Sequence, residues 1–481
     1  MRHAKTVKKR SIAHRFIPVL FCSVTLIVIF AVAVLAIILP KEKVSPSEQR
    51  VLEQSPKFTL KNLFSGDYTA DFEKYYSDTF PLRNELTEKA KDIEALRGIR
   101  DEVMYETDSN NEAGAQGTDE EKKKIYESFM YRNEEPAVME MSKPHPTLGT
   151  SSQSENENPS GGDGGQDIEN PLENEEGNYV NNIFVVGDTA FEIFGRNDKQ
   201  GSAYAKIINK WRAKLPESVR VYNLIVPKNS AFSLPEKYAS KNGDQKAGIE
   251  HIYSELSSGI TPVRIFDTLN AHKNEYLFFR TDHHWTQRGA YYAYTEFAKA
   301  AGFTPHPISD FEIKTFEGYL GTLYNSTKDK KLKANPDTVE AFMAKDRKFT
   351  MTYYITSSSG VVECKRNYII RSKPTSARNS YGVFIDGDNP LTIIKNDSEV
   401  KTGRKLVMVK ESYGNCFAPF MALDFDEVYV VDQRYYNKLV SAGKFPKLAK
   451  LIERDGITDV LFINNMQAAI GGLKSYVESL L

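Results

Sequence analysis

The sequence of 481 residues predicts an α/β domain over residues 179–481, built on a mainly parallel sheet with helices on both faces. Short apolar runs in this region, several with adjacent β-branched residues, are typical of buried strands. Segments with helical periodicity lie between them, and alternating strands and helices favour a parallel sheet. Strands are expected at 182–186, 219–226, 276–279, 405–409, 427–431 and 459–463. Helices are expected at 203–215, 248–256, 287–301 and 445–453.

One region departs from this alternation. Residues 348–396 contain several strand-like runs with no helical periodicity between them. We therefore expect a β-rich insertion within the α/β domain.

The first 39 residues have the pattern of a membrane anchor. Residues 1–15 are basic and contain no acidic residue, and residues 16–39 form an apolar run. About 20 such residues span roughly 30 Å of hydrocarbon as a helix, and a basic flank is retained in the cytoplasm. We therefore expect a cytoplasmic tail at 1–15, a single transmembrane anchor at 16–39 and a large domain outside the cytoplasm.

A cleaved signal peptide is the alternative for this segment. The apolar stretch of a signal peptide normally covers about 7–15 residues and ends at a small-residue cleavage site. Here the run is longer and is followed by Pro40-Lys-Glu-Lys43. Cys22 lies inside the run after Phe21, without the small residues that lipoprotein processing needs. The sequence thus favours an uncleaved anchor.

Two further segments separate the expected anchor from the α/β domain. Residues 40–105 are moderately polar and predict a juxtamembrane helical leader. Residues 106–178 are rich in Glu, Asp, Asn, Gly and Ser and poor in aliphatic residues. Such a segment cannot bury enough apolar surface to offset the entropy lost on ordering. We expect an acidic disordered insertion there, with one short helix near residues 120–130.

Charge and cysteine content exclude two classes of protein. The 63 Lys and Arg residues nearly balance the 64 Asp and Glu residues, so the net charge does not support a nucleic-acid partner. The three cysteines are Cys22, Cys364 and Cys416, and the first belongs to the expected anchor. At most one disulfide could form, which excludes a cysteine-stapled scaffold.

The sharpest chemical motif is Asp282-His-His-Trp285. If this stretch is extended at the end of a strand, positions i and i+2 share a side and place the Asp282 carboxylate beside the His284 ring. A carboxylate on one imidazole nitrogen fixes the tautomer that a general base needs. One alternative is an Asp-His-His manganese site of the phosphodiesterase kind, but its further Asp motifs are not found. The other is a pair of histidines that merely satisfy hydrogen bonds at a strand end.

A second motif, Lys410-Glu-Ser-Tyr-Gly-Asn-Cys-Phe417, follows the strand expected at 405–409. Ser412 falls at the turn from strand to helix, where a side chain is exposed at the carboxyl edge of the sheet. The first amides of a helix can stabilise an oxyanion there, and open α/β sheets bind ligands at this edge. A serine that simply caps the helix is the alternative.

Four segments together resemble the bacterial DHHW family, which is named after the tetrapeptide at 282–285. They are Thr-Asp-His-His-Trp-Thr at 281–286, Phe-Glu-Gly-Tyr-Leu-Gly-Thr-Leu-Tyr at 316–324, Lys-Glu-Ser-Tyr-Gly-Asn-Cys-Phe-Ala-Pro-Phe at 410–420 and Val-Asp-Gln-Arg-Tyr-Tyr at 431–436. The resemblance covers roughly residues 47–83 and 179–481. The family is similar to the SGNH-hydrolase-like domains of the alginate O-acetylation proteins.

The resemblance implies a flavodoxin-like, SGNH-hydrolase-like three-layer α/β/α fold with a Ser-His-Asp site for esterase or acetyltransferase chemistry. Carried over position by position, the nucleophile is Ser412, the general base is His284 and the carboxylate that orients it is Asp282. Family members often have Asp at the position of Glu411, which keeps the charge and leaves the nucleophile unchanged. The resemblance implies neither a metal nor a bound cofactor.

The oxyanion hole is the least defined part of the expected site. Arg434 and Tyr435 follow the strand expected at 427–431 and are candidates for substrate binding or for completing the hole. A helix-capping arginine and a core tyrosine are the alternative reading of these two residues. The family pattern leads us to expect a Gly-Gly-Asn-like turn near Asn389, but the sequence there is Phe384-Ile-Asp-Gly-Asp-Asn-Pro-Leu391.

The expected substrate is a cell-envelope or exported polysaccharide, and the resemblance suggests a membrane-bound acyltransferase as the acetyl donor. Acetyl transfer to a sugar hydroxyl and deacetylation by water are both compatible with the motifs. An inactive scaffold that binds polysaccharide or bridges envelope proteins is an alternative of a different class. Cys416 is interpreted as a small packing residue, because nothing near it in the sequence would lower the pKa of its thiol.

Overall fold

The computed structural model describes residues 67–81 and 170–481, except 346, 358–359, 398 and 400, together with ten further positions between 30 and 58. The chain divides into two units, Met1–Glu127 and Ser128–Leu481. In the first unit, strands β1 (Val44–Ser45) and β2 (Arg50–Val51) pair antiparallel, and α3 (Asp67–Asp78) is helical. The helix lies within the predicted helical leader.

Most of the predicted N-terminal organisation lies outside the described residues. This applies to the tail at 1–15, to nearly all of the anchor at 16–39 and to the acidic insertion up to residue 169. Among the residues that are described, no helix is both long enough and apolar enough to cross a bilayer.

The insertion ends earlier than predicted. Residues 170–178 are ordered, because Leu172 is buried against Phe184 and Val186 and the Asn170 amide donates to the Ser233 carbonyl oxygen at 3.0 Å. The folded unit is thus already formed at residue 170.

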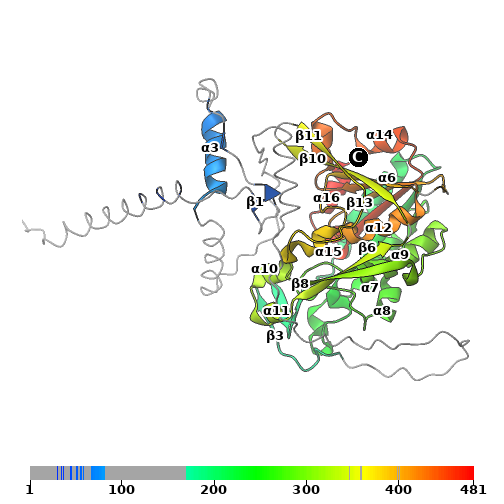
Figure 1. Cartoon of the computed structure of the whole chain (residues 1–481). Helices are drawn as coiled ribbons and strands as arrows, with labels where there is room; N and C mark the ends of the chain where they lie inside the picture. The colour runs from blue at the N-terminus through cyan, green and yellow to red at the C-terminus, as the bar shows by residue number, and fades with distance from the viewer. Residues whose placement is uncertain are drawn as a thin grey trace, which may run out of the picture. The chain divides into compact units, whose positions relative to one another are not determined.

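An eight-stranded sheet forms the centre of the second unit (Figure 1). Its strand order is β11-β10-β12-β14-β13-β15-β6-β7. The five strands from β14 to β7 are mutually parallel, whereas β12, β10 and β11 continue the sheet in antiparallel pairs. The strands are β6 (Arg220–Val226), β7 (Ile260–Pro262), β10 (Phe349–Ser357), β11 (Gly360–Arg366), β12 (Leu391–Asn396), β13 (Lys405–Lys410), β14 (Glu427–Asp432) and β15 (Asp459–Asn465).

The parallel strands are arranged in space as in a flavodoxin-type sheet, but the chain enters the sheet at a different strand. Along the chain, the parallel strands follow in the order β6, β7, β13, β14, β15. If the numbering instead starts at β13 and returns to β6 and β7 after β15, the spatial order is 2-1-3-4-5, which is the flavodoxin order. The point where this order reverses lies between β13 and β15. Ligands of open α/β sheets bind outside the carboxyl ends of the strands at that point.

Helices cover both faces of the sheet. Alternate residues of the central strands, such as Val407 of β13 and Phe462 of β15, pack in one cluster with Trp211. On the other face, Tyr222 packs edge to face on Phe297, at a distance of 5.3 Å between ring centroids. The first layer contains α6 (Asp198–Lys214), α7 (Gln245–Ser254), α13 (Tyr436–Ser441), α14 (Leu448–Arg454), α15 (Met466–Ile470) and α16 (Lys474–Ser479). The second layer contains α9 (Gln287–Ala301) and α12 (Gly414–Asp424), which pack on each other.

Smaller elements surround this three-layer core. An antiparallel sheet consists of β3 (Gly177–Val180), β4 (Ile183–Val186) and β5 (Thr189–Phe191), and β8 (Phe311–Tyr319) pairs with β9 (Asp337–Ala344). Short helices are α8 (Phe266–Ala271), α10 (Thr322–Thr327) and α11 (Lys330–Ala334). Short 3-10 segments are η1 (Asn229–Ala231), η2 (Glu236–Lys241), η3 (Ile308–Asp310) and η4 (Ala377–Val383).

The predicted α/β architecture with a parallel-rich sheet is confirmed, with three corrections. The strand predicted at 182–186 exists as β4, but it belongs to the small antiparallel sheet. The strand predicted at 276–279 is wrong, because Phe278 pairs with Trp285 in an isolated bridge that closes a tight loop. The β-rich region at 348–396 does contain three strands, but they extend the main sheet, and the η4 turn interrupts them.

Replacing a central apolar residue should destabilise this core strongly. Phe462 is fully buried, and its ring centroid lies 5.6 Å from that of Trp211. We expect Phe462→Ala to lower the free energy of unfolding by about 3–5 kcal/mol in urea denaturation. The control Ile308→Ala, at a side chain that is 39% exposed, should change it by less than about 0.5 kcal/mol. Equal effects of the two substitutions would contradict this packing.

The end of α12 carries a buried acid that should make stability depend on pH. Burial raises the pKa of Asp424 to about 6, and its Oδ1 lies 3.8 Å from Nε2 of His306. Because the pKa is higher in the folded state, the folded state binds more protons between about pH 4 and 6, and stability falls as pH rises through that range. Asp424→Asn should therefore stabilise the protein at pH 7.5 by about 1–2 kcal/mol and give no gain at pH 4. Thermal unfolding at both pH values would test this, and a gain of the same size at both would refute it.

Candidate active site

The motif serine stands at the carboxyl edge of the main sheet. Strand β13 ends at Lys410, and Ser412 lies in the turn that leads into α12. The carboxylate of Glu411 holds this turn, because its Oε2 accepts from the Tyr413 amide at 3.0 Å. Its Oε1 accepts from the Asn465 amide, at 2.9 Å, and from the Asn465 side chain, at 3.1 Å. These bonds tie the end of β13 to the end of β15, at the reversal point of the strand order.

The histidine of the first motif reaches this serine. His284 Nε2 lies 2.7 Å from Ser412 Oγ, although the two residues are 128 positions apart. Two further hydrogen bonds join the same stretches of chain, from Trp285 Nε1 to the Tyr413 carbonyl oxygen at 2.9 Å and from the Gln287 side chain to the Cys416 carbonyl oxygen at 3.1 Å. The predicted convergence of the two motifs is therefore present.

The carboxylate of Asp282 orients this histidine. Its Oδ1 lies 2.5 Å from His284 Nδ1 and also accepts from the His284 amide at 3.0 Å. Its Oδ2 accepts from the amide and the hydroxyl of Thr322, at 2.7 and 3.0 Å. Burial alone would raise the pKa of Asp282, but the neighbouring charges of His284 and His283 and these hydrogen bonds lower it well below its ordinary value. The group is therefore a carboxylate.

These contacts define the tautomer of His284. An ionised carboxylate only accepts hydrogen bonds, so the proton in the Asp282–His284 bond belongs to Nδ1. In the neutral imidazole, His284 Nε2 then carries a lone pair and accepts from the Ser412 hydroxyl, whose oxygen also lies 3.3 Å from Glu411 Oε2. This is the arrangement in which an imidazole can remove the serine proton.

The Asp282 side chain is held by a loop in which only glycine fits at position 321. A Cβ on Gly321 would stand 2.2 Å from Cβ of Asp282 and 2.4 Å from its Oδ2. Thr281 fixes the loop from the other side, because its hydroxyl accepts from the Gly321 amide at 3.0 Å and donates to Asp337 Oδ2 at 2.6 Å. Glycine at position 321 therefore lets the Thr322 amide approach the Asp282 carboxylate.

The other histidine of the motif, His283, has no described hydrogen bond to Ser412. Its ring is half-buried, with its centroid 3.8 Å from that of His284, and His283 Nδ1 lies 2.6 Å from Thr322 Oγ1. Burial and the nearby His284 lower the pKa of His283 to about 4, so this ring is neutral near pH 7.

Asp282, His283 and His284 are also the one group of potential metal ligands found among the described residues. Their donor atoms do not fit a metal, because both oxygens of Asp282 and both nitrogens of His284 already take part in the hydrogen bonds above. One histidine nitrogen, on His283, is left over, and a single ligand does not make a metal site.

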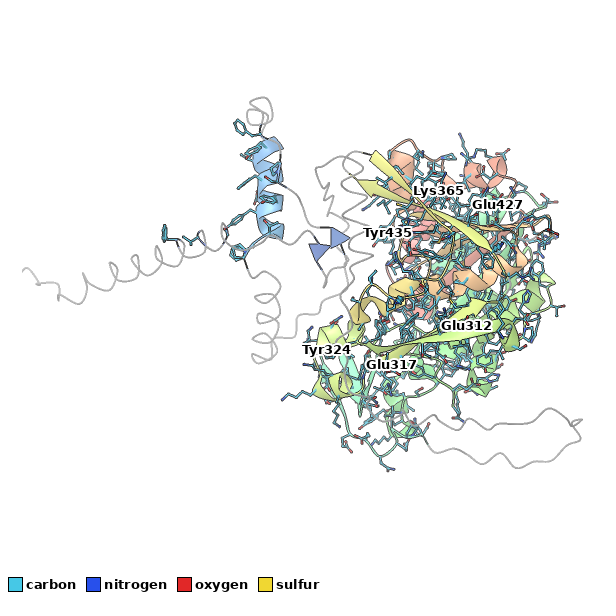
Figure 2. All side chains as sticks on the ribbon, viewed as in Figure 1. Glu312, Glu317, Tyr324, Lys365, Glu427 and Tyr435 are labelled. Atoms are coloured by element: carbon cyan, nitrogen blue, oxygen red, sulfur yellow. The ribbon has the colours of Figure 1, made fainter. Side chains whose placement is uncertain are left out.

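Arg434 and Tyr435 are close to the sheet edge but do not contact the serine or its histidine. The guanidinium of Arg434 binds Asp432 in a bidentate pair, at 2.9 and 2.7 Å, and also Asp388 at 2.9 Å. The Tyr435 ring lies beneath this guanidinium, 5.0 Å from centroid to carbon, on the left-hand rim of the domain in Figure 2. The described hydrogen bonds thus connect both residues to a charge cluster rather than to Ser412.

That charge cluster supports the strand that carries the serine. The ammonium of Lys410 is fully buried and binds Asp432 at 2.8 Å and Asp388 at 3.1 Å. Burial opposes its charge, but the two carboxylates outweigh that effect and raise the pKa of Lys410. The side chain of Asn415 in the first turn of α12 donates to Asp388 at 2.8 Å. Both ends of the Ser412 turn are therefore anchored to one carboxylate.

The turn that presents Asp388 has an unusual backbone. Ile385 and Asp386 have φ angles of 47° and 57°, a region that β-branched residues avoid, and Gly387 follows with 87°. Arg371 and Arg366 bind the Asp386 carboxylate, at 2.7 and 3.0 Å. Asn389 points back into this turn and donates to the Ile385 carbonyl oxygen at 3.1 Å, so its amide does not face Ser412.

Tyr381 is a site residue that the sequence did not reveal. Its hydroxyl donates to the Ser412 carbonyl oxygen at 2.9 Å, and its ring stacks on His284 at 4.2 Å with an interplanar angle of 14°. It comes from η4, in a stretch without a recognisable motif. By contrast, Gly321 and Thr322 lie in the segment 316–324 of the family resemblance, which could have indicated their role.

Cys416 behaves as a packing residue. It is fully buried, and its sulfur lies 3.4 Å from the hydroxyl of Tyr381. Burial raises the pKa of its thiol to about 12, so the sulfur is not a nucleophile near neutral pH.

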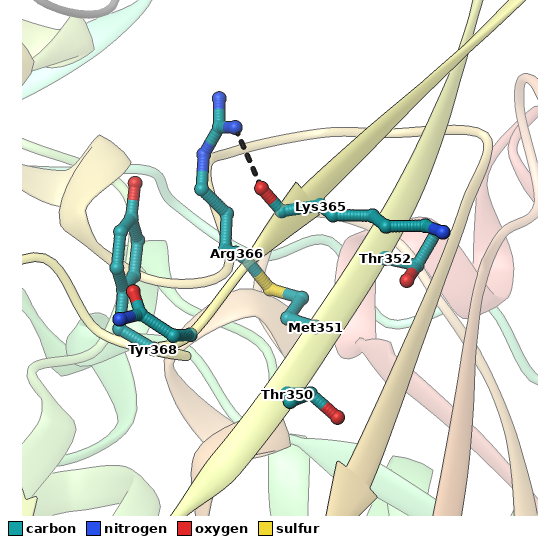
Figure 3. Close-up of a pocket in the computed structure, with 7 residues that line it drawn as sticks. Thr350, Met351, Thr352, Lys365, Arg366 and Tyr368 are labelled. Atoms are coloured by element: carbon teal, nitrogen blue, oxygen red, sulfur yellow. Dashed lines mark hydrogen bonds between the residues drawn. The ribbon is translucent and has the colours of Figure 1, made fainter.

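A pocket of about 710 Å³ lies along the β10–β11 hairpin (Figure 3). Its lining residues are Thr350, Met351, Thr352, Lys365, Arg366, Asn367 and Tyr368. None of them belongs to the Ser-His-Asp arrangement. The pocket does share Arg366 with the turn at Asp386, and it is otherwise a feature of the sheet edge.

The second unit is thus an α/β fold with a parallel-rich sheet. It carries a Ser-His-Asp arrangement at the carboxyl edge of that sheet. The chain belongs to the DHHW protein family, whose model matches residues 48–431. This confirms the predicted family and extends its match across the segment that the motifs left out. No curated protein matches the chain in sequence.

Several solved structures are similar to the chain. A DHHW family protein from Eubacterium siraeum is 31% identical, with a TM-score of 0.56, over 63% of this chain and 97% of the other. PatB1 from Bacillus cereus is 17% identical, with a TM-score of 0.50, over 63% and 100%. The O-acetyltransferase domain of AlgJ from Pseudomonas putida is 14% identical over 61% and 94%, and its TM-score of 0.34 is too low to support an inference. The similarity to PatB1 concerns the fold alone.

The glycine beside Asp282 gives a direct test of this geometry. Gly321→Ala should displace the carboxylate, free His284 to rotate and lower any serine-dependent activity by about 10²–10⁴-fold. Labelling of Ser412 by a fluorophosphonate would measure this effect. Gly195→Ala is the matched control, because a Cβ there meets nothing within 4 Å. Normal labelling of Gly321→Ala would show that the Asp282 contact is not needed.

Proposed function

We propose that this protein is an extracytoplasmic O-acetyltransferase or acetylesterase that acts on a cell-envelope or exported polysaccharide. The observation that carries the proposal is the 2.7 Å contact between His284 Nε2 and Ser412 Oγ, with Asp282 on the other side of the imidazole. A serine nucleophile, a base and an orienting carboxylate are the parts that covalent acyl transfer requires.

The first half-reaction forms an acetyl-serine. Ser412 Oγ attacks the carbonyl carbon of an acetyl ester, and its proton passes to His284 Nε2. The bond between the acetyl carbon and the donor oxygen then breaks, and the leaving alcohol takes the proton from His284. Asp282 remains a carboxylate throughout and stabilises the imidazolium that forms between the two proton transfers.

The second half-reaction passes the acetyl group on. An acceptor hydroxyl loses its proton to His284 Nε2 and attacks the acetyl carbon, after which Ser412 Oγ leaves and recovers the proton. A sugar hydroxyl as acceptor gives transfer, and water gives deacetylation. The mechanism needs only groups that belong to this chain.

The Ser412 amide can stabilise the oxyanion that forms in each half-reaction. Its N–H has no acceptor among the residues described, whereas the amides of Gly414 and Asn415 are bonded to the carbonyl oxygens of Glu411 and Ser412. The stacked ring of Tyr381 limits the motion of the imidazole and excludes water from one of its faces.

The cellular setting of the proposal rests on the sequence. The basic residues 1–15 and the apolar run 16–39 support a single membrane anchor with the Ser412 domain outside the cytoplasm. Acetyl groups must then be supplied across the membrane, so a membrane-bound acyltransferase is the donor partner that we propose. The choice of acetyl esters and polysaccharide follows the resemblance of the motifs to the alginate O-acetylation proteins.

Replacing the serine tests the mechanism. The full-length protein should cleave p-nitrophenyl acetate with a burst, and Ser412→Ala should lower the rate by about 10³-fold or more. Intact-mass spectrometry should find one added acetyl group in the wild-type protein and none in the variant. Acetylated oligosaccharide among the products would identify transfer, and free acetate alone would identify deacetylation.

Ser202→Ala is the matched control for this experiment. Ser202 Oγ also contacts a histidine, His251 Nε2 at 3.0 Å, but it lies on α6, and its hydroxyl donates to Glu255 rather than taking part in the hydrogen bonds around Ser412. This variant should retain the activity. Turnover that survives Ser412→Ala would remove Ser412 from the mechanism, and the absence of any acylation in the wild-type protein would favour the polysaccharide-binding scaffold.

A further inference from the structure

The hydrogen bonds around Thr322 leave one hydrogen-bond acceptor without a partner among the described residues, namely Nε2 of His283, whose ring lies beside that of His284. The Thr322 hydroxyl must donate to the Asp282 carboxylate, because the carboxylate has no proton to give. The same hydroxyl therefore accepts from His283, whose Nδ1 carries a proton. His283 Nε2 is then a lone pair, and no donor approaches it among the described residues.

A second acceptor lies on the same side of the site. Strand β5 is tied to the loop of the Asp-His-His motif, because the Ala190 amide donates to the Arg280 carbonyl oxygen at 2.9 Å. Glu192 follows this strand, and its carboxylate is close enough to His283 for each to affect the pKa of the other. Its Oε2 binds Lys228, which follows β6, and its side chain is 32% exposed.

The cations at this edge are already neutralised. Lys228 is buried and paired with Glu192. On the opposite side of Ser412, Lys410 and Arg434 are both paired with Asp432 and Asp388. The groups that face the reacting centre near His283 therefore accept hydrogen bonds, and they carry no uncompensated positive charge.

We propose that His283 and Glu192 form the acceptor subsite of the acetyl transfer and that this subsite binds the hydroxyl groups of a neutral sugar rather than a uronate. The inference rests on the proposed function, because it names the acceptor of the second half-reaction. A sugar whose reacting hydroxyl meets His284 Nε2 can donate a neighbouring hydroxyl to His283 Nε2, since the two imidazole rings lie side by side at 3.8 Å. A uronate carboxylate brings no donor, and it adds a negative charge beside a Glu192–Lys228 pair whose charges already balance.

Two substitutions distinguish the roles of the two ring nitrogens of His283. His283→Asn keeps a donor near the Nδ1 position, where it can still reach Thr322, but it removes the acceptor at the Nε2 position. His283→Gln instead places an amide oxygen near the Nε2 position. We expect His283→Asn to raise the KM for a neutral β-1,4-glucan oligosaccharide about tenfold and His283→Gln to restore most of that loss.

The measurement compares the two half-reactions in the full-length protein. Acylation of Ser412 by p-nitrophenyl acetate gives the first rate, and transfer to the glucan oligosaccharide or to an oligogalacturonate of the same length gives the second. Wild-type protein should transfer the acetyl group to the glucan at least about tenfold faster than to the uronate. Glu192→Gln should bring the ratio of these two rates closer to one. His272→Asn, at a histidine that binds Glu275, is the control and should change neither rate.

The experiments give different results if the subsite proposal is wrong and if the proposed function is wrong. Equal loss of acylation and transfer in His283→Asn, or a preference of the wild-type protein for the uronate, would overturn the subsite. Binding of the glucan to the Ser412→Ala protein, followed by calorimetry, does not depend on catalysis. If His283→Asn weakens that binding about tenfold, the subsite stands even where no acylation occurs. Unchanged binding would overturn it.

Discussion

The hydrogen bonding of the Asp282 carboxylate is the interaction on which the rest of the site depends. Its two oxygens accept four hydrogen bonds, two from His284 and two from Thr322, and this geometry is possible because residue 321 has no side chain. The imidazole is directed at Ser412 by this fixed group rather than by the serine itself. In the proposed mechanism, a base that is oriented before the substrate arrives needs little reorganisation during the reaction.

The strand order of the sheet explains why these groups meet. The serine follows β13, the carboxylate of Glu411 joins β13 to β15, and the ion pairs of Lys410 reach the end of β14. Parallel strands present their carboxyl ends at one edge, so loops from distant parts of the sequence converge there. The same edge carries Lys228 after β6, which brings the proposed acceptor subsite close to Ser412.

The sequence predicted those parts of the molecule whose signals are local. Strands such as β13 and β15 are short runs of buried aliphatic residues, and α9 has an N-cap threonine and a C-terminal glycine, so its predicted bounds of 287–301 agree with the structure. The parts that it missed depend on distant partners. Phe278 pairs with Trp285 instead of with a sheet, Arg434 is bound by a carboxylate from another turn, and Tyr381 gains its role from stacking on an imidazole almost a hundred residues away.

The position of β15 has a consequence for how the protein is made. It is the last strand in chain order, but it lies between β6 and β13 and so joins the two halves of the parallel sheet. During synthesis on the ribosome, the early strands β6 and β7 and the later pair β13 and β14 emerge without the strand that connects them. Long-range parallel pairing of this kind folds slowly. The exposed strand edges of the nascent chain would therefore be natural targets for chaperones until the final segment inserts.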